Sequence, residues 1–75
     1  MDPLQDQLLD GIGRRIFIRL RNRSFGLSGV LKMFDVHLNL ILDDAREVPR
    51  NPDGKNAATY GRIIVRGDSI VMISF

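Results

Sequence analysis

The sequence lacks most of the chemistry on which enzymes and small secreted domains depend. Its 75 residues include no cysteine, no tryptophan, one histidine and one tyrosine. Without cysteine, a short chain has neither a disulfide nor a thiolate zinc site to stabilise it. A chain of this length buries only about 60% of the surface that it exposes when unfolded. High stability therefore requires self-association, and we expect an oligomer.

Long hydrophobic runs are also missing. No apolar stretch approaches the ~20 residues that a membrane-spanning helix needs. The chain starts with Met1, Asp2 and Pro3 in place of a basic and apolar leader. These features predict a cytoplasmic protein that does not enter a membrane.

Catalytic groups are sparse. No serine lies in a nucleophile elbow, and Asp43 and Asp44 are adjacent, which in a strand sends them to opposite faces and prevents shared acid–base work. A metal site would need His37 with Asp35 or Asp43, a spacing that is specific for no metal. We predict no enzymatic activity, no metal and no cofactor.

Positive charge is concentrated in one segment. The net charge is only +2, but residues 14–23 contain five arginines and no acid. Such a segment attracts phosphates, and it equally suits a solvated strand face that discourages edge aggregation. The sequence alone leaves the role of Arg15, Arg19 and Arg21 open.

A short helix is predicted over residues 3–10. Asp2 can cap its start, and Gly11 can end it in a left-handed conformation. The apolar residues at helical spacing should form the face turned toward the body of the protein: Leu4, Leu8 and Leu9.

Period-two alternation follows the helix. Strands are predicted over residues 15–21, 25–34, 38–48, 60–66 and 70–75, with an exposed loop over 49–59. Gly26 and Gly29 allow the second strand to bend, and Gly67 allows a tight connection with positive φ. The pattern predicts a mainly β fold in a single domain, residues 1–75. Its form should be a small, strongly bent, five-stranded antiparallel barrel with a short N-terminal helix.

The last two strands are apolar on both faces, over residues 63–65 and 70–73. Such strands need cover on both sides, and a small barrel covers only one. We expect the second face to meet another subunit, with exposed strand edges pairing between chains. The alternative is that the N-terminal helix covers the surplus.

A first polar cluster follows the second strand and contains Asp35, His37 and Asn39. If this segment is extended, alternation places the three side chains on one side. An imidazole offers a flat surface for a base, an asparagine amide matches a base edge, and an aspartate can hold that amide in place. The alternative is that these residues are simple turn formers.

A second polar cluster contains Arg66, Gly67 and Asp68, between the last two strands. Arg66 can stack on a base or hold a phosphate, and Gly67 allows nucleic acid to approach the backbone. An ordinary hairpin turn is the alternative.

Both clusters fall within motifs of a known family. Residues 13–45, with Gly29, Phe34-Asp35, Leu38-Asn39 and Leu42-Asp43-Asp44-Ala45, resemble the first Sm motif of Sm and LSm proteins. Residues 60–75, beginning Tyr60-Gly61-Arg62 and including Arg66-Gly67, resemble the second Sm motif. Bacterial Hfq carries a different second motif, of Tyr-Lys-His type, so the resemblance is to archaeal or eukaryotic members.

The resemblance implies the Sm fold and a ring of identical subunits, a heptamer or else a hexamer, in which the fourth strand of one subunit pairs with the fifth strand of the next. It implies one uridine site per subunit, facing the pore. In that site His37 and Arg66 would sandwich the base and Asn39 would read its edge. Asp35 would orient Asn39, and Gly67 with Asp68 would complete the pocket.

We therefore predict a ring that captures uridine-rich single-stranded RNA and acts as an RNA scaffold or chaperone in RNA processing. The alternative is a small-barrel protein-interaction module without direct RNA recognition. A nuclease is a third possibility, but the chain lacks the carboxylate set or histidine pair for phosphoryl transfer.

Overall fold

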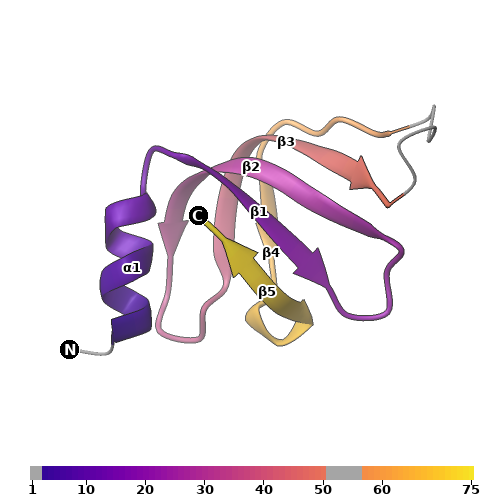
Figure 1. Cartoon of the computed structure of the whole chain (residues 1–75). Helices are drawn as coiled ribbons and strands as arrows, with labels where there is room; N and C mark the ends of the chain where they lie inside the picture. The colour runs from indigo at the N-terminus through magenta and orange to yellow at the C-terminus, as the bar shows by residue number, and fades with distance from the viewer. Residues whose placement is uncertain (1–2, 51–56) are drawn as a thin grey trace.

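The computed structural model of the chain describes residues 3–50 and 57–75. The described elements are one helix, α1 (Pro3–Gly11), one 3₁₀ turn, η1 (Gly67–Ser69), and the strands β1 (Arg15–Leu20), β2 (Phe25–Phe34), β3 (Leu40–Pro49), β4 (Ile63–Val65) and β5 (Ile70–Ser74). The strands form one antiparallel sheet in the order β4-β3-β2-β1-β5 (Figure 1). The predicted mainly β fold is confirmed, as a strongly curled half-barrel behind a short helix.

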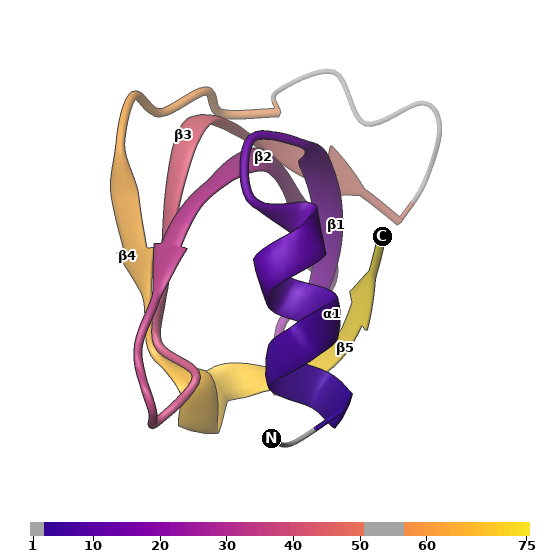
Figure 2. The same ribbon diagram turned by 90° about the vertical axis from the view of Figure 1, so that its left-hand side faces the viewer.

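The curl comes from the two long central strands. The pairing of β2 with β3 shifts register twice, between Ser28 and Val30 and between Leu31 and Met33, and such bulges bend and twist a sheet. A Cβ added at Gly29 would lie 3.0 Å from the Cβ of Leu42, so a side chain at this position would require the neighbouring strand to move by a few tenths of an ångström. Figure 2 shows the result, with β4 and β5 on opposite sides of the opening and α1 in front of it.

The core fills the concave side of the sheet. Its buried members come from the helix and four strands: Leu8, Ile16, Ile18, Leu27, Leu31, Leu40, Leu42, Ala45 and Val65. Ile16 and Ile18 are buried and Leu20 packs against the core, so the alternating apolar residues of β1 form its inward face.

The helix contributes less to the core than its sequence predicts. Leu8 is buried, but Leu4 and Leu9 are exposed, so the prediction of a three-leucine packing face is wrong. Because α1 lies across the opening of a curled sheet, only the centre of its apolar side enters the core. The left-handed residue is Gly13 (φ 85°) in place of Gly11, and the predicted cap Asp2 lies outside the described residues.

Several strand limits differ from the predicted ones. β3 starts at Leu40 because Leu38 has a positive φ of 63°. β4 covers only residues 63–65, since the preceding residues 58–61 run beside the second half of β3, where Tyr60 N–H donates to the Ala45 carbonyl at 2.7 Å. The middle of the predicted loop 49–59 lies outside the described residues.

The two ends of the sheet, β4 and β5, each have one edge without a partner strand in the described chain. Their outward side chains are apolar and exposed: Ile64 at 72%, Val71 at 59% and Met72 at 44%. The alternative in which α1 covers this surplus is wrong, because the helix lies over the opening and leaves these side chains uncovered.

Candidate nucleic-acid interface

The first polar cluster lies in a closed turn between β2 and β3. Asp35 N–H donates to the Asn39 carbonyl at 3.1 Å, and Leu38 N–H donates to the Asp35 carbonyl at 3.0 Å. The expectation of an extended segment is therefore wrong, since the positive φ of Leu38 folds the chain back on itself. A turn, not strand alternation, brings the polar side chains together.

The Asp35 carboxylate is the centre of this turn. Its Oδ1 accepts hydrogen bonds from the backbone N–H of His37 at 2.8 Å and of Asn39 at 3.0 Å, and its Oδ2 accepts from Asn39 Nδ2 at 2.9 Å. The hydrogen bond from the Asn39 side chain, followed by those from the two backbone N–H groups, lowers the pKa of Asp35 below its ordinary value. Asp35 is therefore ionised at neutral pH and holds the Asn39 amide in one orientation.

The second polar cluster docks directly on the first. Gly67 N–H donates to Asn39 Oδ1 at 2.8 Å. A Cβ added at Gly67 would lie 2.2 Å from the His37 carbonyl oxygen and 2.9 Å from the Leu38 carbonyl carbon. The contact between the two loops therefore requires glycine at this position. Gly67 lies in a 3₁₀ turn and does not have the predicted positive φ.

The connection that contains Gly67 is not the hairpin that the sequence left as an alternative. β4 and β5 are at opposite ends of the sheet and do not pair with each other. The η1 segment connects the two ends of the sheet (Figure 2) and brings Gly67 against the β2–β3 turn. The curl of the sheet makes this crossing short.

Charged and aromatic groups surround this contact and face solvent. The Arg66 guanidinium donates to the Asp68 carboxylate at 3.0 Å, and these two side chains are 77% and 67% exposed. His37 joins the turn through its backbone N–H and is exposed. The structure thus brings Asp35, Asn39 and Gly67 into direct contact and leaves His37, Arg66 and Asp68 exposed in the same two loops.

The Asn39 amide has hydrogen-bonding capacity left over. A primary amide offers two N–H donors and an oxygen with two lone pairs. Asp35 takes one N–H and Gly67 takes one lone pair. One N–H and one lone pair remain in fixed, neighbouring positions, which is the pattern that a donor–acceptor edge of a base can meet.

The model of the family described as LSM domain matches residues 6–75, nearly the whole chain. The chain belongs to the LSM domain family. An snRNP Sm-like protein of Methanococcoides burtonii is 39% identical to it over 70 residues, which cover 92% of this chain and 90% of the relative. The predicted resemblance to archaeal Sm-like proteins is confirmed.

Solved structures of Sm proteins are similar to this LSM domain throughout. The SmAP1 heptamer of P. aerophilum has a TM-score of 0.83 at 38% identity, covering 99% of this chain and 93% of that one. The Sm protein of Pyrococcus abyssii, solved in complex with a uridine heptamer, has a TM-score of 0.80 at 32% identity, covering 99% and 97%. Both loops of the candidate interface therefore lie within the region of similarity.

The adjacent acids of the LSM domain serve ion pairs. Arg62 donates through Nε and Nη2 to the two Asp43 oxygens, at 2.7 and 3.2 Å, and this fork lowers the pKa of Asp43. Asp44 contacts the Arg15 guanidinium, which also donates to the Asp44 carbonyl at 3.2 Å. The two carboxylates pair with different arginines. Asp43 ties β3 to the residue before β4, and Asp44 ties β3 across β2 to β1.

Sequence reasoning missed how the arginine-rich segment divides. Arg15 is paired with Asp44, 29 residues away, and the Arg19 guanidinium lies 5.8 Å from the centre of the Phe17 ring. Arg21 and Arg23 fall in the turn after β1. Charge counts alone carry no signal for this division, because the Asp44 partner of Arg15 is brought near by the folded sheet.

The described residues contain neither a cluster of metal ligands nor a membrane-spanning helix. Within residues 3–50 and 57–75, no group of three or more His, Cys, Asp or Glu side chains is placed to hold a metal ion. None of the described helices has the length and apolar character needed to cross a membrane.

Proposed function

We propose that this LSM domain assembles into a closed ring of identical subunits that binds uridine-rich single-stranded RNA. In this proposal the whole chain, residues 1–75, acts as one domain. It serves as an RNA scaffold or chaperone and not as an enzyme.

Ring assembly is supported by the two ends of the sheet. β4 and β5 carry unpaired edges, and Ile64, Val71 and Met72 beside them are apolar and exposed. Pairing β4 of one subunit with β5 of the next satisfies the edges and covers these side chains, and repetition closes a ring. The P. aerophilum relative was solved as a heptamer, so we propose a heptamer, with a hexamer as the alternative.

Uridine recognition is supported by a single observation, the doubly anchored Asn39 amide. A uracil edge offers a carbonyl acceptor beside an N–H donor, and the free N–H and lone pair of Asn39 can meet both. Cytosine offers the reverse pattern. The Pyrococcus abyssii relative was solved with a uridine heptamer, which supports the same class of ligand.

The other site residues complete the pocket. We assign Asp35 to holding Asn39, and His37 and Arg66 to stacking on the two faces of the base. Gly67 keeps the two loops in contact, and Asp68 positions the Arg66 guanidinium through their ion pair. Stacking tolerates any base, so the preference for uridine rests on Asn39.

Native mass spectrometry of the purified protein, with and without oligouridylate, tests the proposal. We expect one ring species, which shifts in mass by the oligomer and shifts far less with oligocytidylate at the same concentration. A monomer would overturn the ring. An intact ring that binds neither oligomer would favour the protein-interaction module. The scaffold or chaperone role is tested separately, by whether the ring speeds annealing of two complementary RNA strands that carry uridine tracts.

A further inference from the structure

The β2–β3 turn carries an unusual residue at its left-handed position. Among the described residues, three that are not glycine have a positive φ: Asn22 (59°), Leu38 (63°) and Asp44 (49°). Asparagine and aspartate tolerate this conformation, whereas a bulky apolar side chain meets steric strain in it. Leu38 ends the loop between Asp35 and Asn39, whose backbones are hydrogen-bonded. A left-handed residue that closes such a loop is usually glycine, so leucine at this position needs another reason.

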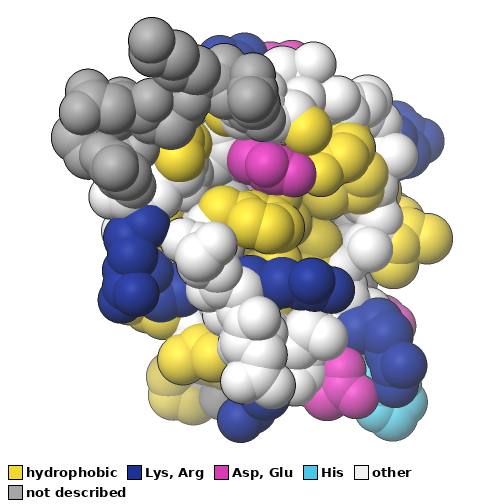
Figure 3. Space-filling model, turned by 90° about the vertical axis from the view of Figure 1, so that its right-hand side faces the viewer, with side chains coloured by type: hydrophobic (Ala, Val, Ile, Leu, Met, Phe, Trp, Pro, Cys, Tyr) yellow, Lys and Arg dark blue, Asp and Glu magenta, His cyan; other side chains and the backbone are white. Residues whose placement is uncertain are grey.

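The Leu38 side chain attaches this loop to the core. It is half-buried and packs against the core residues, whereas Val36 is 76% exposed and His37 is exposed. Leu38 also lines one hollow together with Leu4 of α1 and Gly67 of η1. Figure 3 shows acidic, basic and histidine side chains gathered at one corner of the surface, so the polar part of the loop faces solvent. Within this loop, Leu38 alone packs against the core.

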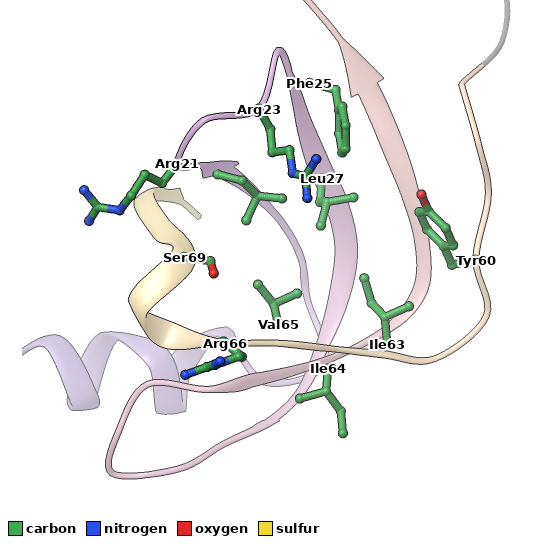
Figure 4. Close-up of a pocket in the computed structure, with 11 residues that line it drawn as sticks. Arg21, Arg23, Phe25, Leu27, Tyr60, Ile63, Ile64, Val65, Arg66 and Ser69 are labelled. Atoms are coloured by element: carbon green, nitrogen blue, oxygen red, sulfur yellow. The ribbon is translucent and has the colours of Figure 1, made fainter.

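The second loop of the site is attached by a comparable apolar residue. Val65 is buried and comes directly before the polar residues of that loop. Figure 4 shows Ile63 and Val65 on one side of β4 and Ile64 on the other, as strand alternation requires. Val65 thus reaches the core from an ordinary strand, whereas Leu38 reaches it from a left-handed backbone. Directly after Leu38 comes Asn39, the residue assigned to base reading.

The hydrogen bonds of Asn39 do not by themselves hold the turn in place. Its amide is bonded to the exposed Asp35 carboxylate and to the Gly67 N–H. Hydrogen bonds near the surface compete with water and contribute little net stability. An apolar side chain gains from leaving water, so the contact of Leu38 with the core opposes movement of the turn.

We propose that Leu38 is a positioning residue for uridine reading. Its side chain holds the β2–β3 turn against η1, so that Asn39 keeps both partners and presents its free N–H and lone pair in fixed positions. The proposal rests on the proposed function. Strain and anchoring predict opposite results for Leu38→Gly, which relieves the strain of a positive φ but deletes the apolar contact. If strain matters more, the variant improves the site, and if anchoring matters more, it loosens the site.

The first test follows the Gly67 N–H in the ring without RNA, by amide hydrogen exchange measured with NMR. This N–H is bonded to Asn39 Oδ1, so its protection reports whether the amide is in place. We expect Leu38→Gly to speed its exchange about tenfold, toward the rate in Asn39→Ala. The Tyr60 N–H, bonded to the Ala45 carbonyl at 2.7 Å, is the reference and should keep its rate. Equal acceleration of both groups would mark a general loss of stability and overturn the proposal.

The second test compares the binding of oligouridylate and oligocytidylate by rings that light scattering shows to be intact. We expect Leu38→Gly to lower the preference for uridine about fivefold or more, the low end of what a two-bond base contact provides. Leu38→Asn should do the same, and it controls for the flexibility of glycine because asparagine also tolerates a positive φ. Leu38→Met keeps an apolar side chain of similar volume and should retain the preference.

A matched control lies in the same loop. Val36→Gly adds the same flexibility and also removes an apolar side chain, but one that is exposed. It should keep both the uridine preference and the protection of the Gly67 N–H. Leu38→Gly combined with Asn39→Ala should discriminate no worse than Asn39→Ala alone, because Leu38 acts through Asn39.

Each contrary result points to a different failure. If the wild-type ring prefers uridine and Leu38→Gly keeps that preference, the positioning role is wrong and the proposed function stands. If the wild-type ring has no preference for uridine, both fail. Equal losses in Val36→Gly and Leu38→Gly would reduce the effect to loop flexibility. If neither Leu38→Gly nor Leu38→Asn forms a ring, Leu38 serves assembly and the proposal is overturned.

Discussion

The two polar loops are the β2–β3 turn and the connection through η1. They differ from the arginine-rich segment in how folding places their residues relative to one another. In the loops, Asp35, Asn39 and Gly67 come from two separated stretches of chain and share one hydrogen-bond network. In the segment, residues 14–23 are close in sequence and end in different surroundings. Arg15 is paired with an acid, Arg19 lies over a ring, and the remaining arginines line or flank different surfaces.

The difference shows which features of the sequence predict that residues lie together in the folded structure. Alternation along β1 places Arg15 and Arg19 on the same face, and Arg21 follows in the next turn, so their different surroundings come from the side chains and turns that lie beside each of them. Loops at the ends of strands are instead gathered by the curl of the sheet. Clustering in sequence was therefore a weaker guide to a shared role than position at strand ends.

The largest effect is expected at the point where the two loops touch. Gly67→Ala places a methyl group against the His37 and Leu38 backbone, so the loops must separate. We expect the free energy of unfolding to fall by about 1–3 kcal/mol, as for other overpacked sites, and uridine preference to disappear. Chemical denaturation and binding of oligouridylate and oligocytidylate measure the two effects.

A matched control is available within the same motif. A Cβ added at Gly61 meets nothing within 4 Å. Gly61→Ala should therefore change stability by less than about 0.5 kcal/mol and leave binding intact. If the two variants behave alike, Gly67 does not hold the two loops together.

The second effect concerns base reading. Asn39→Ala removes the amide but leaves His37 and Arg66, which stack on any base. We expect the variant to hold RNA while its discrimination between uridine and cytidine falls by ~1–3 kcal/mol, by analogy with two-bond contacts to DNA bases. Light scattering must show an intact ring. Full retention of the preference would make Asn39 a turn residue only.

The third effect distinguishes general affinity for RNA from preference for uridine. Arg66→Ala removes one stacking group together with a positive charge at the RNA, so it should lower affinity for uridine, cytidine and adenosine oligomers alike and flatten the log–log salt slope. Arg14→Ala is the charge-matched control, because Arg14 is exposed and lies outside the candidate site. A change confined to uridine oligomers would contradict the role assigned to Arg66.

The fourth effect follows from the lowered pKa of Asp35. A carboxyl whose pKa is lower in the folded than in the unfolded state stabilises the fold above the unfolded value, and this contribution is lost as pH falls through the folded value. The NMR signals of the Asn39 side-chain amide should stay constant from neutral pH to about 4, near the ordinary aspartate pKa, and move only below it. Movement well above that range would show that Asp35 is not held by these bonds.

The smallest effect is expected in the arginine-rich segment. Arg15→Ala breaks an exposed ion pair with Asp44, and such pairs contribute about 0–1 kcal/mol. RNA affinity should remain unchanged in filter binding. A loss as large as that of Arg66→Ala would return Arg15 to the RNA-binding surface and remove the contrast between the two regions.

Much of the fold was predictable from local patterns. The second strand has the predicted limits, and Ile16 and Ile18 are buried as alternation requires. Errors arose where tertiary contacts override the pattern. Residues 60–62 are strand-like in sequence, but they run beside β3 before β4 begins. Of the three helical leucines, only Leu8 enters the core.

The candidate site was predictable as a set of residues but not as a geometry. Asp35, His37 and Asn39 were singled out on the assumption of an extended segment, whereas the chain makes a turn at Leu38. The sequence predicted that Gly67 is needed for a positive φ, and the structure shows a different reason. Gly67 is needed for contact with the His37 backbone, and nothing in the local sequence indicates that contact.

The sequence by itself determined the alternating strands, the apolar surplus on the last two and the membership of the LSM domain family, because hydrophobic period and motif are local properties of the chain. Only the tertiary structure decided that Gly67 meets Asn39, 28 residues away, and that Arg15 meets Asp44, 29 residues away. Hydrogen bonds and ion pairs act over a few ångströms, so their partners are set by the curl and register of the sheet.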